Sequence, residues 1–123
     1  MKEVIAIIRP KMVAKTKTEL EGMGINSMTA IPVLGRGKQK GIMGEVDIEY
    51  RPHIKEQGQS GGMKYVPKRY LSLVVPDSAV EAVIRTVIQV NKTGEIGDGK
   101  LFVCPVDDVL RVRTGETGDN AVL

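Results

Sequence analysis

The sequence predicts a single α+β domain in which two strand–helix–strand halves share one four-stranded antiparallel sheet, with both helices on one face. Each half repeats the same order of features: an apolar run, a proline, a helical segment, a glycine and a second apolar run. A glycine-rich stretch far too long for a hairpin joins the halves. With 123 residues, of which 41% are hydrophobic, the chain can close one core. The expected arrangement is a ferredoxin-like βαββαβ domain spanning residues 1–123.

The first half begins with residues 4–8, a nearly continuous β-branched run that is typical of a central strand. The following Pro10 ends this strand. Residues 12–23 are good helix formers with a thin apolar stripe, and glycines at their end supply a stop. Residues 27–34 return to strand character, and Pro32 indicates an edge position or a bulge because proline lacks a ladder donor.

The second half follows the same order. Residues 70–75 form a strand, and the helix after them has five apolar residues at the spacing i, i+3, i+4, i+7 and i+8. Ser78 and Glu81 have the spacing of a capping box at its start, and Gly94 is suited to its C-cap. Residues 101–106 form the fourth strand of the predicted sheet.

The segment 109–113 alternates apolar residues with Arg111 and Arg113, which predicts a further strand with both arginines on one face. Two guanidinium groups on one face can make bidentate phosphate contacts. The alternative is an edge strand that its charges protect from pairing.

The stretch from residue 35 to residue 68 is expected to be the functional part of the chain. It contains seven glycines, and connections longer than roughly 12–15 residues in a compact domain usually bind something or stay disordered until they do. Ordering such a loop costs roughly 1–2 kcal/mol of backbone entropy per residue, so a ligand or partner can act as its switch. The alternative is an insert without a regulatory role.

Cationic residues gather at the ends of the apolar runs, although the net charge is a mild +3. This placement favours one anionic small-molecule site built from several segments, whereas nucleic-acid binders more often carry a continuous basic stripe. Solvated surface charge is the alternative for any single lysine. The cations concerned are Arg36, Lys38, Lys40, Lys64, Lys68, Arg69, Arg111 and Arg113.

Two glycine-rich segments are candidates for binding phosphate. Residues 35–41, GRGKQKG, combine backbone freedom with three cations and an amide, but they are not a Walker motif. Residues 93–100, TGEIGDGK, carry three glycines and a lysine where a C-cap would need one glycine. A flexible loop is the alternative for the first segment, and a cap with its turn is the alternative for the second.

Nothing in the sequence predicts catalysis. His53 is the one histidine and has no cysteine or paired carboxylates nearby, so we expect a loop surface there, and a turn at Asp107-Asp108. The lone Cys104 lies in an apolar run, which predicts a buried thiol in a reducing compartment. The apolar run near the N-terminus is too short for a signal peptide or a membrane span, which predicts a cytoplasmic protein.

The motifs GRGKQKG, TGEIGDGKLFVCPV and RVRTGE, in this order and spacing, resemble the PII family of nitrogen signal-transduction proteins over nearly the whole chain. Within the family, the GRGKQKG and FVCPV versions are most similar to the longer-loop member of the nitrogenase-associated pair of regulators. Lys38 occupies a position where the family usually has arginine, and Ser72 occupies a position where many relatives have a carboxylate. Neither Tyr50 nor Tyr65 aligns with the modified loop tyrosine, so no modification is predicted.

The resemblance implies a regulator without catalytic activity, with a trimeric core, a T-loop at about 37–66 and a C-terminal segment at 107–123. Such a protein binds ATP or ADP between subunits and senses 2-oxoglutarate with Mg²⁺. It would inhibit dinitrogenase when 2-oxoglutarate is scarce, and associate with a sister PII-like subunit in a homo- or hetero-oligomer. The alternatives are an ordinary PII protein acting on an ammonium transporter or a nitrogen-assimilation enzyme, and an RNA-binding ferredoxin-like module. Aromatic residues at 3% and absent RNP motifs disfavour RNA.

The resemblance assigns two sets of ligand contacts to individual residues of this sequence. Arg111 and Arg113 would contact the nucleotide from a neighbouring subunit. The nucleotide set is Ile7, Thr29, Gly35, Gly37, Lys38, Gln39, Val74, Gly97, Asp98, Gly99, Lys100, Arg111 and Arg113. The 2-oxoglutarate set is Gln39, Lys40, Gly41 and Lys68, with Gln39 also near Mg²⁺.

Overall fold

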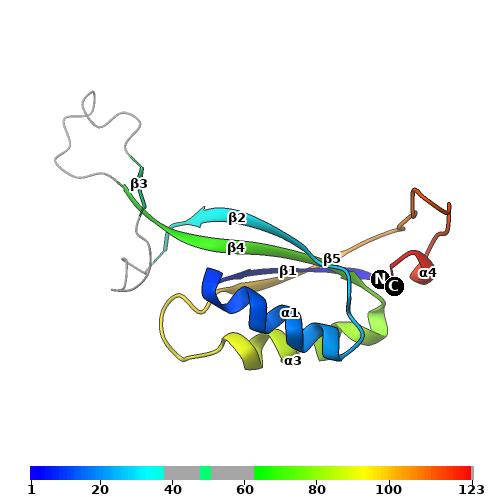
Figure 1. Cartoon of the computed structure of the whole chain (residues 1–123), viewed down its shortest axis with the longest axis horizontal. Coiled ribbons are helices and arrows are strands. Elements are labelled where there is room, and N and C mark those ends of the chain that lie inside the picture. The colour runs from blue at the N-terminus through cyan, green and yellow to red at the C-terminus, as the bar shows by residue number, and fades with distance from the viewer. Residues whose placement is uncertain (38–47, 51–62, 123) are drawn as a thin grey trace.

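The computed structural model describes the backbone of residues 1–37, 48–50 and 63–122 (Figure 1). The strands are β1 (Lys2–Ile8), β2 (Thr29–Gly35), β3 (Ile48–Tyr50), β4 (Met63–Val75) and β5 (Lys100–Pro105). The helices are α1 (Val13–Gly22), α3 (Val80–Asn91) and the single turn α4 (Asp119–Val122). Short 3₁₀ turns, Pro10–Met12 and Asp77–Ala79, precede α1 and α3.

The main sheet has the strand order β2-β4-β1-β5, and every neighbouring pair is antiparallel. β1 lies in its interior, with Ala6 opposite Leu71 of β4 on one side and Leu101 of β5 on the other. This topology confirms the predicted ferredoxin-like α+β fold. Pro32 lies in β2, which pairs with β4 alone among the described strands, so the predicted edge position is also confirmed.

The hydrophobic core lies between the sheet and the two long helices, which cover the same face (Figure 1). Alternate residues of the interior strands point into it, as the period of two requires. The core residues are Val4, Ala6, Ile8, Leu20, Leu71, Leu73, Val75, Val83 and Val87. No helix in the described part of the chain is long and apolar enough to cross a membrane.

Neither of the two long helices covers the opposite face of the sheet (Figure 1). Its alternate residues are apolar too, and Ile31 of β2 and Phe102 of β5 each keep 46% of their surface exposed. Ile5 and Tyr70 lie between them and are half-buried. A glutamate also lies on this face, where Glu3 accepts a hydrogen bond of 2.6 Å from the Ser72 hydroxyl. We refer to this surface as the open face.

The stretch predicted as one long loop is partly strand. β4 begins at Met63 rather than near residue 70, and β3 pairs with its first residues. The ladder between β2 and β4 runs on from Thr29 opposite Ser72 to Gly35 opposite Val66. Backbone pairing with β2 therefore overrides the weak local strand preference of a segment that contains Pro67 and several charges.

Two predictions about capping are wrong. Ser78 lies inside the 3₁₀ turn, so the N-cap of α3 is Ala79, and no side chain caps it. The expected capping box does not form, because the turn continues directly into the helix. At the other end, α3 stops at Asn91 with extended backbone at Lys92, and Gly94 lies beyond the cap with φ +87°.

The predicted strand at 109–113 is also wrong. Leu110 forms a single bridge with Thr117, and the Arg111 N–H donates to the Glu116 carbonyl at 2.8 Å. The segment folds back on itself, because Gly115 (φ +73°) permits a tight turn, instead of extending the sheet.

Two smaller expectations also need correction. Asp107-Asp108 form no turn of their own. The Asp108 carboxylate instead accepts the N–H groups of Val109 and Gly118 at the base of the C-terminal turn. Cys104 is half-buried rather than buried, since it lies opposite Glu3 on the open face. His53 lies outside the described residues.

Candidate functional site

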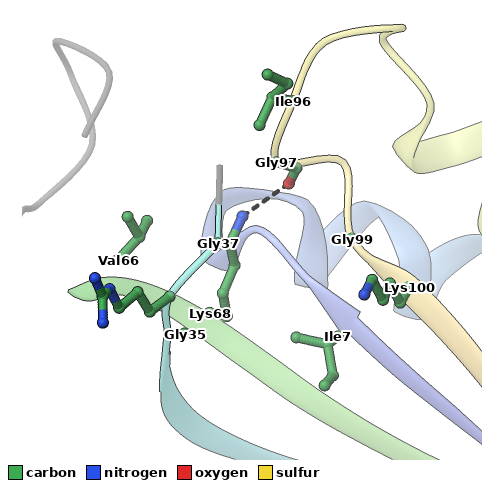
Figure 2. A pocket seen from close by; sticks show the side chains of 10 residues that line it. Ile7, Gly35, Gly37, Val66, Lys68, Ile96, Gly97, Gly99 and Lys100 are labelled. Atoms are coloured by element: carbon green, nitrogen blue, oxygen red, sulfur yellow. Dashed lines mark hydrogen bonds between the residues drawn. The ribbon is translucent and has the colours of Figure 1, made fainter. Parts of the chain in front are cut away.

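One cavity of about 510 Å³ lies at the end of the sheet where β1 ends (Figure 2). Four chain segments that are far apart in the sequence form its wall. They are the end of β1, the end of β2, the first half of β4, and the connection between α3 and β5. The lining residues are Ile7, Gly35, Arg36, Gly37, Val66, Lys68, Ile96, Gly97, Gly99 and Lys100.

Much of the predicted site meets in this cavity. The predicted residues that line it are Ile7, Gly35, Gly37, Lys68, Gly97, Gly99 and Lys100. The predicted residues that lie outside the described residues are Lys38, Gln39, Lys40 and Gly41. The cavity therefore brings the two glycine-rich segments and Lys68 together, which is the convergence that an anion site made from several segments requires.

The remaining predicted residues do not line this cavity. Thr29 lies opposite Ser72, and Val74 lies opposite Glu3, so both share the open face with Ile7 but lie further along the sheet. Arg111 and Arg113 belong to the C-terminal turn, where the Arg111 guanidinium donates to the Glu116 carboxylate at 2.8 Å and to the Asn120 carbonyl at 3.0 Å. The resemblance assigns these arginines to a neighbouring subunit, so their role stays a prediction.

Lys68 joins two walls of the cavity. Its side chain is only 8% exposed, and its ammonium nitrogen Nζ donates to the carbonyl oxygen of Gly97 at 2.7 Å (Figure 2). Its alkyl chain passes Gly35, where a β carbon would lie 3.5 Å from Lys68 Cγ. A buried lysine that faces a cavity is a ready partner for a carboxylate or phosphate.

The connection between α3 and β5, residues 92–99, is held together by Asp98. Its carboxylate accepts hydrogen bonds from the Thr93 hydroxyl, from the N–H groups of Thr93 and Gly94, and from the Arg9 guanidinium. The Thr93 hydroxyl above all, and then Arg9 and these N–H groups, hold the pKa of Asp98 well below its usual range. Because its carboxylate is engaged inside the connection, Asp98 organises the loop, and its predicted contact with a nucleotide stays a prediction.

Arg9 is a residue that the sequence analysis missed. Its side chain is buried, with one guanidinium nitrogen 2.7 Å from Asp98 Oδ1 and another 3.1 Å from the Ile96 carbonyl oxygen. At this position the sequence predicts only the end of a strand. A usable signal was present, because a cation that directly follows a buried central strand must find a partner.

The cavity wall combines positive charge with apolar surface. Arg36, Lys68 and Lys100 supply the charge, and none of the described residues that line the cavity is acidic. Ile7, Val66 and Ile96 supply apolar side chains, while the glycines leave their N–H groups open to close approach. Such a wall suits an anion that carries a flat or apolar group.

A metal site of protein side chains is not found in the described part of the chain, where no three potential ligands cluster. Gln39, the residue that the resemblance places near Mg²⁺, lies outside that part.

Comparison with known proteins identifies the family. Residues 1–116 match the family model described as nitrogen regulatory protein P-II. The chain is 52% identical over 124 residues to the nitrogen fixation nifHD region GlnB-like protein 2 of Methanobacterium ivanovii, with 100% of both chains covered. It is equally identical over 122 residues to the corresponding protein of Methanosarcina barkeri, with 99% of both chains covered.

A solved structure supports the same assignment. The crystal structure of Arabidopsis thaliana PII bound to citrate is 36% identical, with a TM-score of 0.73, and the match covers 98% of this chain and 88% of that one. The resemblance to the PII family and to its nitrogenase-associated branch is thus confirmed. This chain belongs to the PII family of nitrogen regulatory proteins, which are regulators rather than enzymes.

Proposed function

We propose that this chain senses adenine nucleotide and 2-oxoglutarate at the cavity and inhibits dinitrogenase when 2-oxoglutarate is scarce. The observation that carries the proposal is the convergence of two glycine-rich segments, Lys68 and Lys100 on one cavity. The nifHD-region names of the relatives support dinitrogenase as the target.

The phosphates of the nucleotide would bind where both glycine segments meet. Gly35 and Gly37 line one side of the cavity, and Gly97 and Gly99 line the other, with the Lys100 ammonium beside them. Backbone N–H groups in glycine-rich turns bind phosphate oxygens well, and a lysine adds charge. Ile7 offers an apolar contact to the base, while Arg111 and Arg113 would complete the site from a second copy.

The carboxylates of 2-oxoglutarate would bind at Lys68, together with Gln39, Lys40 and Gly41. Lys68 already lines the cavity with its ammonium group, and a carboxylate would add charge–charge attraction to the hydrogen bond that this group donates. Gln39 would be the residue that holds a magnesium ion, and this ion would supply positive charge to the nucleotide phosphates.

The same cavity touches both ends of the T-loop. Gly35 ends β2, and Val66 and Lys68 belong to β4, so a ligand in the cavity contacts the two strands between which the loop runs. Binding would favour one geometry of the loop root over another. Dinitrogenase would bind the geometry that forms without 2-oxoglutarate, and ligand binding would release it.

Assembly into a trimeric core completes this proposal. The open face exposes Ile31 and Phe102, and a contact between copies would bury it. The branch of the family also suggests assembly with a sister PII-like subunit. Light scattering on the chain alone, and on a mixture with that subunit, distinguishes homo- from hetero-oligomers.

Calorimetry and an activity assay test the proposal. We expect ATP and ADP to bind, 2-oxoglutarate to bind in the presence of Mg-ATP, and dinitrogenase activity to fall when the chain is added without 2-oxoglutarate. A variant lacking residues 44–62 should keep nucleotide binding but lose inhibition. Nucleotide binding without any effect on dinitrogenase would point to another PII target, and the absence of nucleotide binding would refute the sensor itself.

A further inference from the structure

We propose that Arg9 is a positioning residue that fixes the orientation of residues 96–98 at the cavity wall and thereby sets the affinity for the nucleotide phosphates. The proposal rests on the proposed function and adds a residue that neither the motifs nor the resemblance assigned. Arg9 does not line the cavity, so it acts through the residues that do.

The geometry around Arg9 supports this role. The guanidinium is buried at the end of β1 and binds the connection at two points, the Asp98 carboxylate and the Ile96 carbonyl oxygen. A planar guanidinium with several donors in a fixed arrangement can hold both acceptors at once, which a lysine cannot do in the same way. The two contacts lie on either side of Gly97, which has a positive φ (+104°) and lines the cavity.

Lys68 completes the arrangement from the other side. Arg9 binds the carbonyl of Ile96, and Lys68 binds the carbonyl of Gly97, so two buried cations hold two consecutive peptide units. The carbonyl and the N–H of one trans peptide point in opposite directions. Consequently the N–H groups of Gly97 and Asp98 point away from the cations, in an orientation that is set before any anion arrives.

The two cations differ in where they lie. Lys68 lines the cavity and donates to the Gly97 carbonyl oxygen, whereas Arg9 lies behind the connection and is paired with the Asp98 carboxylate. A ligand that contacts Lys68 in the cavity therefore does not have to displace Arg9. Arg9 would keep the segment in place through every ligand state of the site.

The experiment compares ATP affinity by calorimetry in the full chain and in three variants. Arg9→Gln removes the charge and the planar set of donors, and Arg9→Lys retains the charge. Val83→Ala weakens the core near the start of α3, at the other end of the helix from the connection. Loss of a charge-assisted contact corresponds to roughly a tenfold or larger weakening, so we expect this for Arg9→Gln, a smaller loss for Arg9→Lys and none for Val83→Ala. Amide hydrogen exchange at residues 96–99, without nucleotide, should accelerate in Arg9→Gln beyond the general change seen in Val83→Ala.

The outcomes separate this inference from the proposed function. The positioning role would be refuted if Arg9→Gln bound ATP as tightly as the wild-type chain, or if Val83→Ala lost as much ATP affinity as Arg9→Gln. Neither result would refute the proposed sensor function. If the wild-type chain binds no nucleotide, the proposed function fails. Amide hydrogen exchange would then still test whether Arg9 fixes residues 96–98. Unchanged exchange rates in Arg9→Gln would refute that role.

Discussion

A β carbon at Gly99 would lie 1.9 Å from the carbonyl oxygen of Ile7. The backbone of the connection therefore passes against the end of β1 more closely than any side chain allows. Gly99 also has φ +107°, which residues with a β carbon rarely adopt. This contact sets how closely the connection between α3 and β5 lies against the end of β1 at the cavity.

The contact between Gly99 and Ile7 predicts that adding one methyl group at Gly99 destabilises the fold strongly. We expect Gly99→Ala to lower the free energy of unfolding by about 3 kcal/mol or more, because backbone strain and the overlap with Ile7 both add. The matched control is Gly94→Ala, which has φ +87° but no atom within 4 Å of its β carbon. It should cost about 1–2 kcal/mol. Chemical denaturation measures both, and equal losses would show that the close approach is unimportant.

Asp98 predicts how stability responds to acid. Its pKa is lowered in the folded chain, so its contribution to stability is fully present above the unfolded pKa of about 3.9 and declines as the pH falls toward the folded pKa. Between pH 6 and pH 3, the free energy of unfolding should therefore fall further for the wild-type chain than for Asp98→Asn. Denaturant titrations at both pH values measure this difference, and parallel losses in the two proteins would contradict it.

Lys68 predicts a specific loss of 2-oxoglutarate binding. Lys68→Met keeps most of the buried alkyl volume but removes the amine that reaches the cavity. We expect affinity for 2-oxoglutarate to fall at least about tenfold, the loss of one charge-assisted bond. Lys92→Met, at an exposed lysine outside this cavity, should bind as the wild-type chain does. Undiminished binding in Lys68→Met, measured by calorimetry with Mg-ATP present, would place the 2-oxo acid elsewhere.

The open face predicts the oligomeric state of a charged variant. Phe102→Asp places a carboxylate on the surface that we expect copies to bury, and an unpaired buried charge is strongly unfavourable. Light scattering should then report a monomer at micromolar concentration. Ile88→Asp is the control, since Ile88 is 45% exposed on α3, on the helical side. A trimer that persists in Phe102→Asp would mean that another surface forms the contact.

The sequence predicts the sheet and its helices well because the apolar periodicities are strong where burial is strong. Val4, Ala6 and Ile8 alternate with less buried residues, and the spacing of Val83 and Val87 matches one helical face. The same reasoning fails at the start of β4, because its pairing depends on β2 and not on its own composition. It also fails at residues 109–113, which belong to a tight turn that Gly115 permits and not to an extended strand.

The candidate site is predictable for residues with distinctive backbone chemistry and not for those defined by contacts across the fold. Gly97, Gly99 and Lys100 stand out in the sequence as an excess of glycine beside a charge. The position of Arg9 after a buried strand indicates that it needs a partner but not which one, because Ile96 and Asp98 are 87 and 89 residues away. The contacts of the Asp98 carboxylate within the connection could not be predicted for the same reason, because the spacing of a motif does not determine the direction of a side chain.

The position of β1 between β4 and β5 has a consequence for synthesis of the chain. Residues 2–8 leave the ribosome well before their neighbours in the sheet, which are residues 69–75 and 100–105. At roughly 5–20 residues per second, an unpaired and strongly apolar strand waits several seconds for its first partner. Contacts so distant in sequence also make folding slow. The nascent N-terminal strand is therefore the segment most exposed to mispairing, and the one for which a chaperone during translation would matter most.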